Sequence, residues 1–542
     1  MRLQLSGEHE YPVAPLSVPH LETGARRESV AASDAVTLFV ERARAVKPDF
    51  ALRAENVEAV VEICARLDGL PLALELAAAR IKLLPPQALL PRLEQRLQLL
   101  TGGPRDLDER QRTLRNTIDW SYSLLPPDEQ ALFARLAVFV GGRTLEAAEA
   151  ICSPGGDIDV LEAMTALLDN SLIRQEESEG DARFVMLETI HEYARGRLGD
   201  SGEEDDLSRR HAEYFLALAE TAESELRGAE AASWLRRLNA ERENLRAASD
   251  WAHATGQVDL ELRLATPLVL FWVVAGHVSE GRAKIERLLG TQFENDELRA
   301  RALLAFVRIA NWQGDAARAK PAAAELVALR RRLENEGELA RALHYAGAVA
   351  AVGQEYDASE RLIQEAIDVA RRAGNLEQMN EAMLNLGRLE LERGNLDSAR
   401  PLLEEVLAFA RDRGHSLQVA IALANLGQLA LEQDRFDDAE VTVAEALASS
   451  IELGYPDGIA DALDERAILL IAAERPERAA VLFGATEAAR AELGSAITPG
   501  DQRFRDRALA QLREQLGETR LSIGLAEGAA MTLDEAIEYA HG

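Results

Sequence analysis

A repeat of 40 residues constrains this chain more than any other feature of its sequence. Small side chains recur at this spacing through the C-terminal half, at Val307, Gly347, Gly387, Gly427 and Ala467, and again from Ala319 to Ala479. Each unit has two apolar stretches of helical period around a short polar turn. Because such a pair cannot bury its own apolar face, neighbouring units must stack. The sequence therefore predicts an α-solenoid over residues 207–495, with about six repeats.

The composition supports a helical fold and narrows the function. The chain has 542 residues, with 60 Lys and Arg against 92 Asp and Glu, so its formal net charge is −32. A chain this acidic repels phosphate, so we do not expect it to bind DNA by itself. Aromatic residues make up only 5% of the chain and alanine is abundant, a balance that favours helix. We expect a mostly α-helical protein.

The cysteine content and the hydropathy of the chain indicate its cellular compartment. Cys64 and Cys152 offer neither a disulfide framework nor a zinc site, and they fit a reducing environment. The most apolar run, Leu268–Ala275, is far too short to span a bilayer. The sequence therefore predicts a cytoplasmic protein without a membrane segment or a metal site.

The N-terminal third shows helical signals of another kind. Ser33 followed by Asp34 is typical of a cap that opens an amphipathic helix, and a second helix is expected from Val57 to Leu67. The run Gly69–Leu74 predicts a turn into a third helix, with Pro71 in its first turn and an end near Leu84, before two prolines. These helices predict a small helical subdomain over residues 33–103.

Several motifs in this part resemble one family. The run Gly69–Leu74 (GLPLAL) is the most specific, and the segments Arg112–Tyr122, Leu136–Gly142 and Arg183–Ala194 accompany it. Together they resemble the NB-ARC family of STAND signalling ATPases, especially its actinobacterial transcriptional-regulator branch. The resemblance implies that residues 1–32 are a remnant of a nucleotide-binding domain edge, that residues 104–200 form a winged-helix subdomain, and that helices in 496–542 cap the repeats.

The phosphate-binding elements of that family are missing from this sequence. No Gly-x-x-x-x-Gly-Lys-Ser/Thr run is present, and no apolar strand ends in paired aspartates. We therefore expect a non-catalytic chain that begins after the nucleotide-binding core and holds no cofactor, although the intact family uses ATP or ADP. By resemblance, Pro71 would pack on an adenine only if such a core were supplied; otherwise it starts a helix. Leu187 stands where many relatives have a phosphate-contacting histidine.

The repeats themselves resemble tetratricopeptide (TPR) repeats with lengthened helices. By that resemblance, the side chains two residues before the signature glycines and one residue after them face the concave groove. We therefore predict that a groove for a protein or peptide partner is lined by Asn385, Arg388, Asn425 and Gln428. An asparagine there can both donate to and accept from a peptide backbone. The alternative is that these residues are solvated helix positions without a partner.

The winged-helix resemblance raises DNA binding as a further question. Arg105, Arg110, Arg112 and Arg115 form a modest basic cluster. However, the candidate recognition helices, 127–139 and 145–151, carry carboxylates where a DNA-reading helix needs basic or amide side chains. We therefore expect an interdomain packing module. The leading interpretation is a regulatory or scaffold protein that binds partners through its repeats; the alternative is an ATP/ADP-dependent transcriptional regulator, with or without direct DNA binding.

Overall fold

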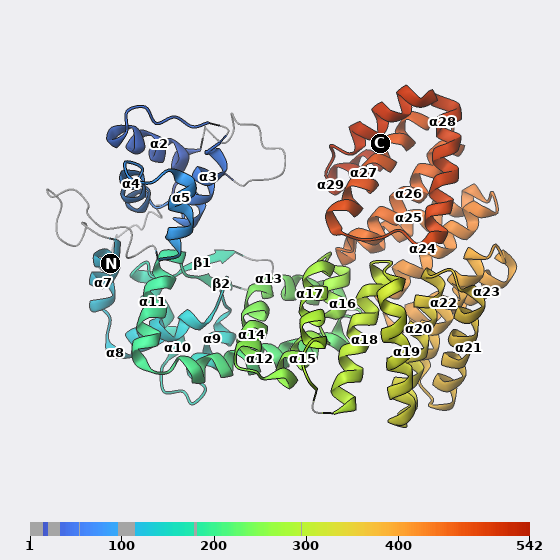
Figure 1. The fold of residues 1–542 in the computed structure, drawn as a ribbon, viewed down its shortest axis with the longest axis horizontal. Helices are drawn as coiled ribbons and strands as arrows, with labels where there is room; N and C mark the ends of the chain where they lie inside the picture. Colours follow the sequence, from blue (N-terminus) through green and yellow to red (C-terminus); the bar gives the residue numbers. More distant parts are fainter. Residues whose placement is uncertain are drawn as a thin grey trace, which may run out of the picture. The chain divides into compact units, whose positions relative to one another are not determined.

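The computed structural model describes residues 15–19, 33–53, 55–95, 114–177, 182–293 and 295–541 (Figure 1). The chain divides into two compact units, Met1–Tyr214 and Phe215–Gly542. Helices make up nearly all of the described structure, which confirms the mostly α prediction. Within the described residues, no helix is long and apolar enough to cross a membrane. The motif residues Arg112 and Thr113 and the arginines at 105 and 110 lie outside the described ranges.

The first unit begins with the helical subdomain that the sequence predicts. It contains α2 (Asp34–Val46), α3 (Val57–Arg66), α4 (Pro71–Arg80), the short α5 (Pro86–Leu89) and a 3₁₀ helix, Leu90–Gln95. Ser33 precedes α2 as expected, but its hydroxyl donates to the Ser17 carbonyl rather than capping the helix. α4 ends at Arg80, before the predicted Leu84, because residues 81–84 form a turn ahead of Pro85.

The turn before α4 explains the glycine of the GLPLAL run. Gly69 has φ +62°, and a Cβ built on it would lie 2.2 Å from the Leu16 carbonyl oxygen. The Leu16 amide donates to the Gly69 carbonyl at 3.0 Å, so the two backbones lie in direct contact. Only glycine fits both the conformation and the space.

The second part of this unit is a winged helix. It contains α7 (Leu114–Ser123), α8 (Pro127–Arg135), a 3₁₀ turn (Leu136–Val138), α9 (Leu145–Cys152), α10 (Val160–Asp169) and α11 (Glu188–Ser201). The wing is an antiparallel pair, β1 (Arg174–Glu177) and β2 (Ala182–Val185), in which Arg174 faces Val185. His191 contacts the carbonyls of Ala137 and Phe139 with its Nε2 atom, so it holds the 3₁₀ turn rather than a ligand.

The second unit follows along α12 (Glu204–Glu225), within which the boundary between the units falls. Shorter helices come next: α13 (Ala231–Ala240), α14 (Arg242–Ala254), α15 (Val258–Ala265), α16 (Val269–Val274) and α17 (Val278–Leu289). Five longer pairs follow, and they carry the 40-residue repeat. They are α18 (Asp296–Trp312) with α19 (Ala316–Arg332), α20 (Glu336–Val352) with α21 (Tyr356–Arg372), α22 (Leu376–Glu392) with α23 (Leu396–Arg413), α24 (Ser416–Glu432) with α25 (Phe436–Leu453), and α26 (Pro456–Ala472) with α27 (Pro476–Leu493).

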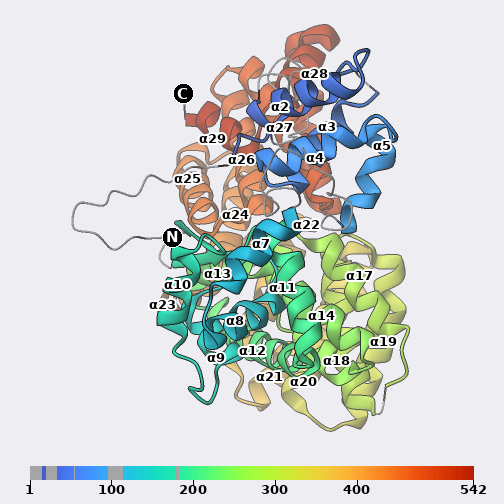
Figure 2. The same cartoon turned by 90° about the vertical axis from the view of Figure 1, so that its left-hand side faces the viewer.

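Left-handed turn residues separate these helices at a constant spacing. They are Gly314, Glu334, Gln354, Gly374, Gly394, Gly414, Asp434, Gly454, Glu474 and Gly494, all with positive φ. The short polar turn that the sequence predicts within each unit contains one of them, for example Gly314 or Gly394. A single residue in this conformation ends one helix and reverses the chain into the next. The constant spacing therefore explains why the pairs stack in one register, side by side in chain order (Figures 1 and 2).

Small residues at the repeat positions allow the paired helices to approach closely. A Cβ on Gly387 of α22 would lie 2.9 Å from Cδ2 of Leu403 in α23, its partner helix. The array also closes on itself. A Cβ on Gly276, in the turn between α16 and α17, would lie 2.7 Å from Cδ2 of Leu493 at the end of α27. Arg227, just after α12, pairs with Glu381 of α22 at 3.0 Å.

The C-terminal helices α28 (Pro499–Gly528) and α29 (Leu533–His541) complete the unit. Gly517 kinks α28, with φ 75° and ψ 161°. After the kink, α28 packs on α27 so closely that a Cβ on Gly528 would lie 1.8 Å from the Val481 carbonyl oxygen. This half covers the last repeat as a cap. Before the kink, however, α28 contacts the inner helices α22, α24 and α26, a placement that the capping prediction for residues 496–542 did not include.

Candidate binding cavity of the repeat array

The inner helices of the repeats surround a cavity of about 330 Å³. Its wall comes from α18, α20, α22, α24 and α26, with Leu226 and Arg227 at one side and the segment Ser495–Arg505 at another. Eight carboxylates and five arginines line it, together with amide and apolar side chains. A concave site of this volume, with polar groups converging on it, is a common form of ligand site.

All four predicted groove residues lie on this wall: Asn385, Arg388, Asn425 and Gln428. The structure thus brings the predicted positions together, and partner binding by them stays a prediction. Their hydrogen bonds also show roles within the protein. Asn425 is 8% exposed, and its amide donates to the Ile421 carbonyl one turn earlier at 2.7 Å. Gln428 is half-buried and has no hydrogen bond to another described residue, so its amide faces the cavity unengaged.

Asn385 is held by a buried histidine. Its amide lies against Nε2 of His344 in α20, which is 4% exposed. Burial lowers the pKa of His344 to about 4, so the imidazole is neutral at pH 7. With Nε2 accepting from Asn385, the ring proton is on Nδ1, which lies 3.9 Å from Glu381. This pair ties the second inner helix to the third.

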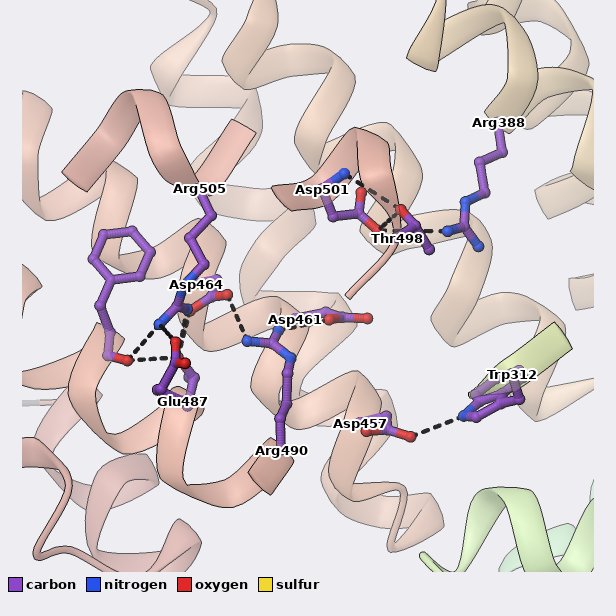
Figure 3. A network of polar contacts seen from close by, with 12 residues as sticks. Trp312, Arg388, Asp457, Asp461, Asp464, Glu487, Arg490, Thr498, Asp501 and Arg505 are labelled. Atoms are coloured by element: carbon purple, nitrogen blue, oxygen red, sulfur yellow. Dashed lines mark hydrogen bonds and ion pairs between the residues drawn. The ribbon is translucent and has the colours of Figure 1, made fainter. Parts of the chain in front are cut away.

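Arg388 is engaged by the C-terminal segment. Its Nη2 atom lies 3.5 Å from Oδ2 of Asp501 in the first turn of α28, and Thr498 donates to the same carboxylate (Figure 3). Deeper in the wall, Arg505 is 3% exposed and donates to Asp464, to Thr486 and to the Phe483 carbonyl. Arg490 pairs with both Asp461 and Asp464 at 2.8 Å. The tail therefore forms part of the cavity wall.

Carboxylates one helical turn apart line the α26 side of the cavity: Asp457, Asp461 and Glu465. Asp457 accepts from Nε1 of Trp312 at 3.0 Å (Figure 3). Burial raises the pKa of Asp461 to about 6, against the opposing effect of Arg490. Burial and the neighbouring carboxylates raise the pKa of Glu465 well above its ordinary value. Glu465 is 7% exposed, and its Oε2 atom has no hydrogen-bond partner among the described residues.

Sequence reasoning named Asn385 and Asn425 but missed Glu465. The signal was available, because Glu465 follows Asn425 at the same 40-residue spacing that separates Asn425 from Asn385. Its carboxylate occupies the space beside a signature glycine: a Cβ on Gly427 would lie 2.6 Å from Glu465 Oε2. The tail residues Asp501 and Arg505 could not be found this way, since they lie outside the repeat.

The N-terminal candidates lie elsewhere. Pro71 is exposed at the first position of α4, where its fixed φ suits a helix start. Leu187 directly precedes α11. The predicted recognition helices correspond to α8 and α9, but the helix that leads into the wing is α10. The assignment of the recognition helix to 127–139 or 145–151 therefore needs correction, because the wing fixes the order of the helices. α10 carries Glu162 and Asp169 and no basic residue.

A winged helix and a repeat array of this kind define a class of helical regulatory protein, and comparisons with known proteins agree. A family model described as a winged helix-turn-helix domain matches residues 125–199. A model described as a tetratricopeptide repeat matches residues 338–412 and 378–452. Both kinds of module are those that the sequence analysis expected, and the domain bounds given there stay a prediction.

Curated relatives match part of this chain, some named as putative transcriptional regulators and others as uncharacterized proteins. One is "Putative HTH-type transcriptional regulator Rv0890c" of Mycobacterium tuberculosis, 37% identical over 348 residues, which cover 62% of this chain and 39% of that protein. Another, "Uncharacterized protein Rv0894" of the same species, is 38% identical over 214 residues, covering 39% of this chain and 51% of that one. The chain thus spans about two fifths to one half of the length of these relatives. The matches confirm the resemblance to actinobacterial regulators that carry a winged helix and tetratricopeptide repeats.

Among solved structures, the chain is similar to a STAND protein with a tetratricopeptide repeat sensor, PH0952 from Pyrococcus horikoshii. The identity is 13%, the TM-score is 0.41, and the match covers 93% of this chain and 73% of that one.

Proposed function

We propose that this chain is a non-catalytic regulatory protein that binds a peptide, or a segment of a partner protein, inside its repeat array. The observation that carries the proposal is the cavity of about 330 Å³, to which every inner helix from α18 to α26 contributes side chains. Repeat arrays use concave surfaces of this kind to bind extended partners. The relatives named as regulators support the regulatory role, and the two buried free cysteines fit a reducing cytoplasm.

Site-specific photo-crosslinking tests the proposal directly. A benzophenone amino acid is introduced in place of Gln428, which lines the cavity, and in a second variant in place of Val441, which is 69% exposed on α25. After irradiation in the source cells, the Gln428 variant is expected to yield a crosslinked peptide or protein that the Val441 variant does not. Equal yields from both positions, or only crosslinks within the chain, would overturn the proposal.

A nucleotide switch is the competing function, and it requires groups that this sequence lacks. No P-loop run is present, and Pro71 lies exposed at a helix start. We expect no heat of binding when ADP is titrated into the chain in a calorimeter. Micromolar binding of ADP would contradict the proposal and favour an ATP/ADP-dependent switch.

We do not propose that the chain reads DNA. α10, the helix before the wing, carries carboxylates and no basic side chain that could contact the major groove of DNA. We expect no sequence-selective retardation of genomic fragments in a gel shift at low salt. Selective retardation would assign that role to the winged helix.

A further inference from the structure

The cavity wall formed by α26 has an unusual charge pattern. Glu465 lies at the repeat position that holds Tyr345, Asn385 and Asn425 in the three preceding pairs. These three side chains are uncharged at pH 7, so the repeat fold does not need a carboxylate there. Ionising a carboxyl group at 7% exposure costs free energy unless a cation or donors compensate it, and the raised pKa of Glu465 reflects this cost. Its presence at this position therefore needs a reason other than packing.

The surroundings of Glu465 do not supply that compensation. The charged groups that act on it are the carboxylates of Asp461, Asp464 and Asp501. Three arginines of the wall are engaged by other carboxylates: Arg490 and Arg505 by Asp464, and Arg388 by Asp501. Among the described residues, no ion pair involves Glu465, and its Oε2 atom lacks a hydrogen-bond donor.

Asp461 and Asp457 extend the negative wall along the same face of α26. Asp461 lies one turn before Glu465, and its side chain is 47% exposed, although it lies within the cavity. Asp457 is 8% exposed, and within the described ranges the neutral indole of Trp312 is its hydrogen-bond donor. A positively charged group entering the cavity would therefore meet carboxylates at successive turns of one helix.

We propose that the α26 wall binds a cationic group, the ammonium or guanidinium of a basic side chain in a peptide, with Glu465 as its main partner and Asp461 and Asp501 flanking it. This inference rests on the proposed function, because it names the chemistry of the ligand in the same cavity. A guanidinium supplies planar donors that match carboxylate geometry. It would satisfy Glu465 Oε2 and balance the excess of carboxylates that line the cavity.

Ligand and protein variants test the proposal together. The probe is an acetylated, amidated pentapeptide with arginine at its centre and alanine elsewhere, titrated calorimetrically into the full chain. Its control is the same peptide with citrulline, which keeps the shape of arginine and removes its charge. We expect the arginine peptide to bind at least about tenfold more tightly than the citrulline peptide. Arginine amide, a small free amine, is titrated as a second probe. It distinguishes binding of a peptide side chain from binding of a small cationic ligand.

On the protein side, Glu465→Gln keeps the size of the side chain and removes its charge. We expect it to weaken binding of the arginine peptide about tenfold and to leave the citrulline peptide unaffected. Asp461→Asn should weaken the same peptide less. Glu452→Gln is the matched control, since Glu452 is exposed on the neighbouring α25 and lies outside the cavity lining. Urea unfolding of each variant confirms that it folds.

The outcomes separate the two proposals. Equal affinity for the arginine and citrulline peptides, unchanged affinity in Glu465→Gln, or no binding of the arginine peptide at millimolar concentration would overturn the cationic site. If the crosslink at Gln428 persists in Glu465→Gln while any of these results is found, the partner-binding function stands and only this inference falls. Stronger binding of arginine amide than of the peptide would assign the site to a free amine instead.

Discussion

Arg388 of α22 and Asp501 of α28 lie 113 residues apart in the chain, yet Nη2 of the arginine lies 3.5 Å from Oδ2 of the aspartate. The contact joins a predicted groove residue to the C-terminal helix. Because the two side chains are 33% and 37% exposed, solvent screens the pair. We predict that Asp501→Asn lowers the free energy of unfolding by less than about 1 kcal/mol, measured by urea denaturation. A larger loss would mean that this pair, rather than the deeper contacts, holds the tail.

Arg505 is expected to be the stronger anchor of the same helix. It is 3% exposed and donates to the Asp464 carboxylate, the Thr486 hydroxyl and the Phe483 carbonyl. Removing one partner of a buried pair leaves the others uncompensated, so Arg505→Ala should cost about 3 kcal/mol in urea denaturation. Hydrogen exchange should also speed up in the part of α28 before Gly517. Unchanged exchange there would show that Arg505 does not dock the helix.

The cap formed by the second half of α28 depends on close backbone contact. A Cβ on Gly528 would lie 1.8 Å from the Val481 carbonyl oxygen and 2.8 Å from the Ala485 nitrogen, and backbone atoms cannot rotate away. Gly528→Ala should therefore destabilise the second unit by about 3 kcal/mol, the upper range for overpacking. Gly196→Ala in α11, where nothing lies within 4 Å, is the control and should be neutral or slightly stabilising. Thermal unfolding of the two variants compares them.

The buried histidine gives the protein a pH-dependent stability. In the folded chain the pKa of His344 is lowered to about 4, whereas in the unfolded chain it titrates near its ordinary value of 6.5. Between these values the unfolded chain binds more protons, so stability falls as the pH falls through this window. We predict that the advantage of the wild type over His344→Gln shrinks by about 2 kcal/mol between pH 7 and pH 5. Parallel urea titrations at both pH values measure it, and a constant difference would show that folding does not lower the pKa of His344.

Much of the fold could be predicted from the sequence because the repeat fixes local structure many times over. Each unit carries its own turn and its own small residue. Gly387 and Gly427 therefore indicate the same close helix packing in successive repeats. The Gly69–Leu74 run was equally informative, since Leu16 and Gly69 leave no room for a side chain. The identity of α10 as the helix before the wing was missed because β1 is polar and both strands have only four residues, too few to show a strand pattern.

The candidate site was predictable only where it obeys the repeat. Asn385, Arg388, Asn425 and Gln428 follow from the spacing, and all of them line the cavity. The hydrogen bond between Asn385 and His344 joins two repeats, and the contacts of Asp501 and Arg505 join the tail to the array. Such contacts depend on the curvature of the array, which periodicity alone does not determine. The sequence shows that residue 465 is a glutamate, but it does not show that no arginine of the described chain pairs with it.

The contact between Gly276 and Leu493 affects how the repeat array can unfold. An open solenoid frays from its two ends, because each terminal repeat has a neighbour on one side only. Here the turn after α16 and the end of α27 meet, and Arg227 reaches Glu381 across the array. Neither end can therefore melt without breaking contacts to the opposite end. The second unit should therefore behave as a closed ring that unfolds in one cooperative step.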